Sequence, residues 1–168
     1  MITLVLGGAR SGKSVVAEAL AARSPAPITY VATIPADPAD GDLQARIDSH
    51  RARRPGGWAT VEVGPAALAA VLRTTTGTVL VDSLGGWVAG ASDLAVDVDH
   101  LGDALTTRHG DSVVVSEEVG MGVHPSSEVG RRFRDVLGEV NQGVAAIADR
   151  VLLVVAGRVL PLDDASPR

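Results

Sequence analysis

The 168 residues correspond to one domain of ordinary size, and the composition narrows what that domain can be. Apolar residues make up 46% of the chain and aromatic residues only 2%, so the core must consist of aliphatic side chains, as in proteins with buried parallel strands. A formal net charge of -5 argues against a nucleic-acid partner, and the absence of cysteine excludes disulfide bonds and thiolate metal sites.

The N-terminal sequence "MITLVLGG" lacks a charged leader and a cleavage site. The longest apolar runs of the chain have the length of strands rather than of membrane-spanning helices. We therefore expect no membrane span and no signal peptide, and a soluble protein located in the cytoplasm.

Strands and helices alternate in the prediction for the first half of the chain. Short apolar or β-branched runs predict strands, and apolar residues at intervals of three and four predict helices. Proline at position 65 suits the first turn of a helix. On these criteria strands cover residues 2–6, 28–33 and 60–63, and helices cover residues 14–23, 42–54 and 65–73.

The second half continues the alternation and ends with a predicted strand pair. Strands are predicted over residues 78–83, 112–118 and twice within 150–162, and helices over 93–108 and 127–149. This order predicts an α/β fold with a mostly parallel central sheet flanked by helices and with an antiparallel C-terminal strand pair. Ligands of such folds bind beyond the carboxyl ends of the strands.

The stretch "LGGARSGKS" contains the phosphate-binding pattern Gly7-x-x-x-x-Gly12-Lys13-Ser14 between a predicted strand and a predicted helix. Glycines let the main chain wrap a phosphate, Lys13 would reach the β- and γ-phosphates, and the Ser14 hydroxyl would bind Mg²⁺. The alternative is a glycine-rich turn with a solvated lysine. We expect residues 1–168 to form a single P-loop nucleotide-binding domain with the architecture of P-loop (RecA-like) NTPases.

Acidic residues follow two of the predicted strands. Asp82 ends "TVLVD", the place where phosphate-loop enzymes often keep the acid that orients magnesium. It could instead cap the turn that follows. Glu117 and Glu118, after "SVVVS", are rival candidates for the same role.

A basic helix is predicted around "RIDSHRARRP". On it Arg46, His50 and Arg54 are spaced at intervals of four, which places an imidazole between guanidinium groups. Such a stripe suits a polyphosphate, and a neutral histidine can attack phosphorus while arginines stabilise the developing charge. Alternatively, His50 only borders the core beside Leu43 and Ile47.

Together the motifs "GGARSGKS", "YVAT", "RIDSHRARRP", "VLVDSLGGWV", "VSEEVGMGVHP" and "FRDVLGEVNQ" resemble the bifunctional adenosylcobinamide kinase and adenosylcobinamide-phosphate guanylyltransferase family. The resemblance implies two reactions. A nucleoside triphosphate, ATP or GTP, first gives its γ-phosphate to the hydroxyl of adenosylcobinamide. GTP then gives GMP to that phosphate through a covalent histidine–GMP intermediate, and pyrophosphate is released.

The resemblance also implies that His50 is the nucleophile and that the protein is a homotrimer in which a neighbour completes each site. The positions that would hold the nucleotide are Gly7, Gly8, Ala9, Arg10, Ser11, Gly12, Lys13, Ser14, Ala32, Thr33, Ile34, Arg51, Ala52, Arg53, Arg54, Glu62 and Asp82. Two other functions stay open: a P-loop small-molecule kinase without guanylyltransferase activity, and a regulatory GTP-binding protein. The lack of an Asn-Lys-x-Asp motif counts against the regulatory protein.

Overall fold

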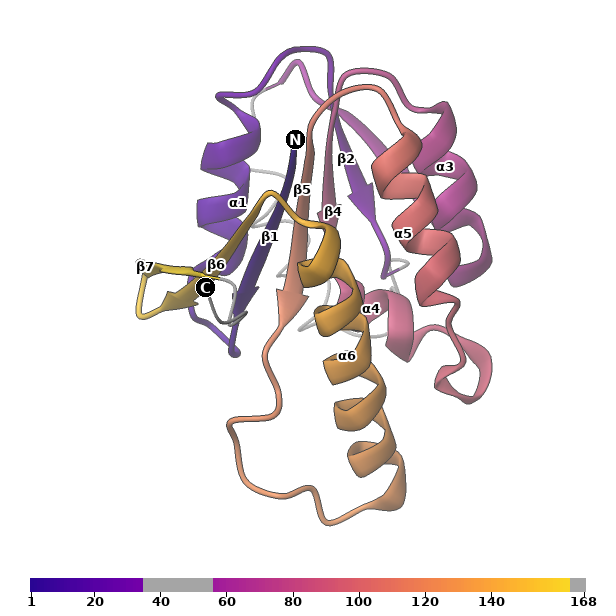
Figure 1. The fold of residues 1–168 in the computed structure, drawn as a ribbon, viewed down its shortest axis with the longest axis vertical. Coiled ribbons are helices and arrows are strands. Elements are labelled where there is room, and N and C mark those ends of the chain that lie inside the picture. Colours follow the sequence, from indigo (N-terminus) through magenta and orange to yellow (C-terminus); the bar gives the residue numbers. More distant parts are fainter. Residues whose placement is uncertain (35–55, 164–168) are drawn as a thin grey trace.

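A seven-stranded sheet organises the computed structural model, which describes residues 1–34 and 56–163 (Figure 1). The strand order is β3-β2-β4-β5-β1-β6-β7, and every neighbouring pair is parallel except β6 and β7. The strands are β1 (Ile2–Gly7), β2 (Ile28–Ala32), β3 (Ala59–Glu62), β4 (Thr78–Asp82), β5 (Ser112–Glu117), β6 (Arg150–Val155) and β7 (Arg158–Leu162). The fold class expected from the sequence is confirmed.

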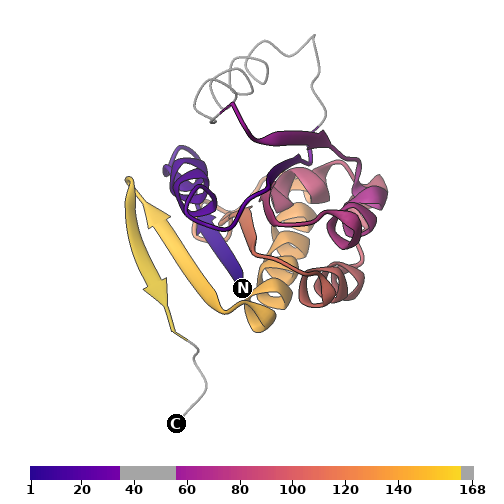
Figure 2. The same ribbon diagram turned by 90° about the horizontal axis from the view of Figure 1, so that it is seen from above.

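Helices cover both faces of this sheet (Figure 2). They are α1 (Lys13–Ala21), α3 (Leu68–Thr74), α4 (Leu84–Ala89), α5 (Val98–Thr107) and α6 (Glu128–Ile147). Helix α1 packs on one face, and α3, α4, α5 and α6 pack on the other. The predicted helix over residues 42–54 lies outside the described residues.

Side chains of the central strands alternate between the two faces of the sheet, so the core has two layers. In β4, Val79 and Val81 belong to the cluster that contains α3 to α6, whereas Leu80 belongs to the cluster that contains α1. All three side chains are at most 1% exposed. Because successive residues of a strand point to opposite faces, a run of aliphatic residues can serve both layers at once.

Three helical features differ from the sequence expectation. The predicted helix over residues 65–73 is a 3₁₀ segment over Pro65–Ala67 followed by α3. The helix predicted from Asp93 begins only at Val98, because Asp97 caps α5 by accepting a hydrogen bond from the His100 amide at 2.8 Å. Asp93 itself lies in a short 3₁₀ segment with a φ of 52°. Helix α4 was not predicted, although Ser83 caps it by accepting a hydrogen bond from the Gly86 amide.

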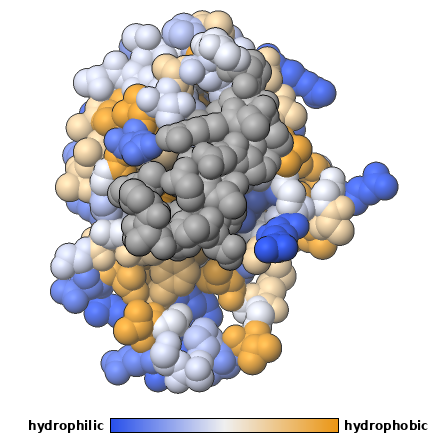
Figure 3. Space-filling model, turned by 180° about the vertical axis from the view of Figure 1, so that it is seen from behind, coloured by the Kyte–Doolittle hydropathy of each residue, from blue (hydrophilic) through white to orange (hydrophobic). Residues whose placement is uncertain are grey.

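The face of the molecule seen in Figure 3 mixes polar and apolar groups among the described residues. Helix α6, at 20 residues, is the longest helix in the part of the chain that the structure describes, and it carries many charged side chains. Within the described part of the chain, no helix has both the length and the apolar character needed to cross a membrane.

Arg108 connects, by hydrogen bonds, the turns that precede β4 and β5. It is 8% exposed and donates hydrogen bonds to the carbonyl groups of Gly77 at 2.7 Å and Asp111 at 2.7 Å. It also donates to the carbonyl groups of Leu72, Thr75 and Gly110. Burial lowers the pKa of Arg108, and the charge of Asp111 opposes that shift.

We expect Arg108→Met to lower the free energy of unfolding by about 3 kcal/mol, because the substitution leaves several carbonyl groups without their donor. Denaturant titration followed by circular dichroism measures this change. Arg132→Met, at an exposed position on α6, is the matched control and should stay within about 0.5 kcal/mol of the parent protein. Equal stabilities of the two variants would contradict the assigned role of Arg108.

Candidate active site

Charged residues gather where the central strands end. The strand register aligns Gly7 of β1 with Glu117 of β5, and Ala32 of β2 with both Asp82 of β4 and Glu62 of β3. Since these strands are parallel, their carboxyl ends lie along one edge of the sheet (Figure 1). The phosphate loop and three acids therefore share this edge.

The phosphate loop forms a tight turn before α1 begins. The Ser11 amide donates to the Gly8 carbonyl at 3.3 Å, and the backbone has positive φ at Arg10 (56°) and at Gly12 (94°). The turn between β6 and β7 supports the loop from outside, because the Gly157 amide donates to the Ser11 carbonyl at 2.8 Å. Such a tight backbone turn at a helix N-terminus is the arrangement that binds phosphate.

Gly7 is enclosed, whereas its neighbour Gly8 is open. A Cβ at Gly7 would collide with the Ser11 hydroxyl and would lie 2.8 Å from the Val154 carbonyl oxygen, but a Cβ at Gly8 would meet no atom within 4 Å. The Val154 oxygen belongs to the sheet backbone and cannot move aside freely. The first glycine of the motif is therefore required by packing.

We expect Gly7→Ala to destabilise the nucleotide-free protein by about 2 kcal/mol, because the added methyl group overpacks the loop against β6. Gly8→Ala makes the same change one residue away and should unfold at nearly the parent's temperature. Thermal unfolding without nucleotide compares the two variants. A Gly8→Ala variant as unstable as Gly7→Ala would show that packing around Gly7 is not the cause.

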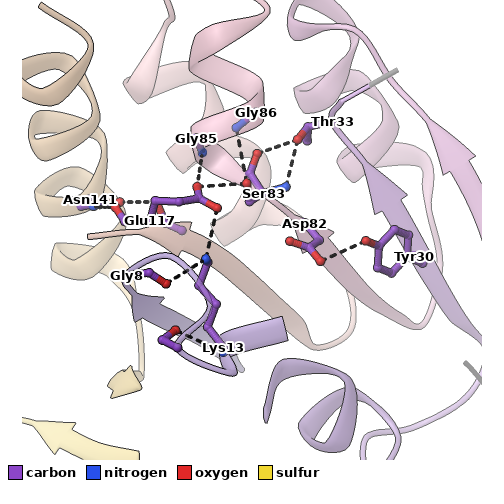
Figure 4. Close-up of polar contacts among 12 residues, drawn as sticks. Gly8, Lys13, Tyr30, Thr33, Asp82, Ser83, Gly85, Gly86, Glu117 and Asn141 are labelled. Carbon is purple, nitrogen blue, oxygen red and sulfur yellow. Dashed lines mark hydrogen bonds and ion pairs between the residues drawn. The ribbon is translucent and has the colours of Figure 1, made fainter. Parts of the chain in front are cut away.

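Lys13 lies buried behind the loop, with 8% of its surface exposed. Its Nζ is 3.4 Å from the Gly8 carbonyl oxygen and 3.4 Å from Glu117 Oε1 (Figure 4). The other carboxylate oxygen, Oε2, accepts hydrogen bonds from the Ser83 hydroxyl and the Gly85 amide, each at 3.0 Å. The lysine thus has a counter-ion that is itself fixed to the start of α4.

The remaining acids face other partners. Asp82 Oδ2 accepts a hydrogen bond from the Tyr30 hydroxyl at 3.0 Å (Figure 4). Glu118 Oε1 accepts from the Gly120 amide at 2.7 Å, within the loop after β5. Of the three candidate acids, Glu117 is the one that contacts the phosphate-loop lysine among the described residues.

A pair of hydrogen bonds locks the ends of β2 and β4 together. The Thr33 hydroxyl donates to the Ser83 carbonyl at 2.6 Å and accepts from the Ser83 amide at 3.0 Å. The Thr33 amide donates to the Asp82 carbonyl at 3.3 Å. These bonds fix the backbone that presents the Asp82 carboxylate to the site.

The side chains present suit magnesium rather than a softer metal. Ser14 and Asp82 offer a hydroxyl and a carboxylate, and hard cations prefer oxygen ligands. The described residues contain no group of three or more His, Asp or Glu side chains that could hold a metal by themselves. Mg²⁺ takes one or two protein ligands in phosphate-binding sites and completes its shell with phosphates and water, and the Ser14 hydroxyl and the Asp82 carboxylate are ligands of that kind.

The family "Cobinamide kinase / cobinamide phosphate guanyltransferase" matches residues 3–162 of this sequence. The chain belongs to this family. The family's two named activities are a kinase and a guanylyltransferase, which agrees with the phosphate loop and with the resemblance noted from the motifs.

Curated relatives support membership of the cobinamide kinase/guanyltransferase family. The chain is 42% identical to the bifunctional adenosylcobalamin biosynthesis protein CobP of Pseudomonas aeruginosa, over 96% of this chain and 97% of the relative. It is 40% identical to the corresponding protein CobU of Salmonella typhimurium, over 94% of this chain and 97% of the relative.

Solved structures place this family member in the P-loop NTPase fold. A type III secretion ATPase from pathogenic bacteria superposes with a TM-score of 0.57 at 11% identity, over 90% of this chain and 50% of that chain. The type III secretion ATPase EscN of enteropathogenic E. coli gives 0.57 at 11% identity, over 92% and 43%. At such low identity, and with half or less of those chains covered, the likeness shows the fold alone.

The structure brings most predicted nucleotide-binding residues to the phosphate-loop edge of the sheet. The described members of that set are Gly7, Gly8, Ala9, Arg10, Ser11, Gly12, Lys13, Ser14, Ala32, Thr33, Ile34, Glu62 and Asp82. The other members, Arg51, Ala52, Arg53 and Arg54, lie outside the described residues, and so does the predicted nucleophile, His50. Their roles stay predictions of the sequence.

Three residues of this site were missed by sequence reasoning: Tyr30, Ser83 and Asn141. Asn141 is 8% exposed, donates to the Glu117 carbonyl at 3.0 Å and accepts from the Ser116 hydroxyl at 2.6 Å. A signal for it was available, because Asn141 interrupts the apolar face of α6 between the buried Val140 and Val144. A buried amide on an apolar face must find hydrogen-bonding partners.

Proposed function

We propose that this chain phosphorylates adenosylcobinamide with a nucleoside triphosphate and then transfers GMP from GTP to the product. The observation that carries the proposal is the buried Lys13 of a closed phosphate loop, beside the acid-bearing ends of β4 and β5. Family membership supplies the two reaction classes.

In the kinase step, the substrate hydroxyl oxygen attacks the γ-phosphorus and the nucleoside diphosphate leaves. Lys13 would lie against the phosphate oxygens and stabilise the charge that develops on them. Ser14 and Asp82 would hold Mg²⁺, which screens the phosphate charges when bound. The loop amides of Gly8 to Lys13 would orient the triphosphate for in-line transfer.

In the guanylyl transfer step, His50 would attack the α-phosphorus of GTP and pyrophosphate would leave. The phosphate of adenosylcobinamide phosphate would then attack the histidine-bound phosphorus, which yields adenosylcobinamide-GDP and restores the imidazole. Arg51, Arg53 and Arg54 would stabilise the charge on the transferred group. These assignments rest on the resemblance of "RIDSHRARRP" to the family motif.

Three further properties complete the proposal. Residues 1–168 form a single P-loop domain, the protein acts as a homotrimer in which a neighbour completes each site, and it works in the cytoplasm. Light scattering at several protein concentrations tests the homotrimer, since a constant mass near three times 17.1 kDa is expected. Cell fractionation tests the location.

The test of the function uses the purified protein with Mg²⁺ and adenosylcobinamide. GTP or ATP labelled at the γ-phosphate should yield labelled adenosylcobinamide phosphate, and GTP labelled at the α-phosphate should then yield labelled adenosylcobinamide-GDP. Transfer of the γ-label alone would reduce the assignment to a kinase. Slow hydrolysis of GTP that adenosylcobinamide does not change would favour a regulatory GTP-binding protein.

A further inference from the structure

Glu117 has a fixed backbone next to the phosphate loop. Its carbonyl accepts from Asn141 Nδ2 at 3.0 Å, and the amide of the following residue, Glu118, donates to the Gly7 carbonyl at 3.1 Å. Asn141 is held in turn by the Ser116 hydroxyl at 2.6 Å. The end of β5 is therefore anchored to both α6 and the loop.

The two oxygens of the Glu117 carboxylate have separate partners. Oε2 accepts from the Ser83 hydroxyl and the Gly85 amide, each at 3.0 Å, whereas Oε1 lies 3.4 Å from Lys13 Nζ (Figure 4). The close approach requires glycine at position 85, because a Cβ there would collide with Oε2. Two hydrogen bonds thus orient the carboxylate so that one oxygen faces the lysine.

This arrangement has opposite consequences for the bound nucleotide and for the transition state. Lys13 is buried, and an ordered ammonium group stabilises developing phosphate charge best when it needs no reorganisation. The same carboxylate competes with the phosphates for Lys13 and repels them at short range. Glu117 should therefore raise the rate of transfer while it weakens the binding of nucleotide.

We propose that Glu117 is a positioning residue of the kinase step, which holds Lys13 toward the phosphates at the expense of nucleotide affinity. This inference rests on the proposed function. It differs from a role as the magnesium acid, because loss of a metal ligand weakens nucleotide binding in the presence of Mg²⁺. It also differs from a purely structural role, because damage to the fold does not tighten binding.

The main test is Glu117→Gln, which keeps the size of the side chain and an oxygen that can accept from Ser83 and Gly85. We expect this variant to bind GTP about tenfold more tightly by calorimetry without Mg²⁺, since one nearby negative charge is removed. Its kcat for phosphorylation should fall about tenfold or more. Glu139→Gln, on the exposed side of α6, is the matched control and should change neither quantity.

A spectroscopic test follows from the fact that Lys13 is the only lysine of the chain. Lysine labelled with ¹³C at Cε places the label on one methylene group, so its signals need no assignment. In the parent protein the two Hε protons should have distinct shifts, because the ammonium group is held. In Glu117→Gln they should merge, and merged shifts in the parent protein would overturn the inference.

A second variant covers the case in which Glu117→Gln does not fold. Ser83→Ala removes one of the two bonds to Oε2, together with the α4 cap that accepts from the Gly86 amide, and keeps every charge, so we expect a kcat several-fold lower and an unchanged GTP affinity. If Glu117→Gln does fold, the same change in its background should add little. Unchanged kcat in Ser83→Ala, or independent effects in the double variant, would overturn the inference.

The outcomes separate this inference from the proposed function. If the parent protein does not phosphorylate adenosylcobinamide, the proposed function fails. If the parent protein is active and Glu117→Gln binds GTP no more tightly, or keeps its kcat, the inference alone fails. The binding and spectroscopic measurements use nucleotide or protein alone and do not depend on the corrinoid.

Discussion

Replacing Lys13 with alanine is expected to lower kcat/KM for the phosphorylation of adenosylcobinamide by about a thousandfold, which corresponds to several kcal/mol. The reason is that Lys13 supplies a buried positive charge next to the closed phosphate loop, at 8% exposure. No other lysine exists in the chain that could take its place. Steady-state kinetics with γ-labelled nucleotide measure the change.

The control for this experiment is Lys13→Arg, which keeps the charge but replaces a compact ammonium group with a broad guanidinium group. The buried space between Gly8 and Glu117 is occupied by the lysine amine, so we expect the arginine variant to recover only part of the activity. If Lys13→Ala keeps wild-type kinetics, the phosphate loop takes no part in the reaction.

His50→Ala is expected to abolish covalent labelling of the protein by GTP that is labelled at the α-phosphate. A histidine–GMP bond is a phosphoramidate, so the label on the parent protein should be lost in acid. Because His50 does not take part in the γ-phosphate transfer we propose, the variant should keep its kinase activity. Intact-protein mass spectrometry after exposure to GTP measures the added GMP directly.

A histidine that lies outside the proposed chemistry provides the control for this label. His100 lies on α5 near Arg73, with 3.0 Å between Nε2 and the guanidinium, and His100→Ala should keep the full label. Persistence of the label in His50→Ala would mean that another residue is the nucleophile. Absence of label in the parent protein would leave the chain as a kinase only.

The fold was largely predictable because its strands and longest helices carry strong patterns. Buried aliphatic runs marked the central strands, and the apolar face of α6 marked that helix to within a few residues at each end. Helix α4 was missed because its six residues include Gly85 and Gly86, and glycine is a poor helix former. Its stability comes from the Ser83 cap and from burial, which a local pattern does not reveal.

The site was predictable only in part. Motif spacing identified the loop from Gly7 to Ser14, and each acid was expected at a strand end, but the strand order decides which acid meets Lys13. Strand β5 lies between β1 and β4, and this order places Glu117 rather than Asp82 beside the lysine. Contacts between strands far apart in sequence depend on packing of the whole sheet, which no local pattern encodes.

The turn between β6 and β7 has a practical consequence for any modified form of this protein. Ala156 and Gly157 both adopt positive φ there, and the Gly157 amide reaches the Ser11 carbonyl. Fusion tags or deletions that loosen this hairpin would also disturb the phosphate loop, because Gly157 contacts Ser11 although the two residues are nearly 150 positions apart in the sequence.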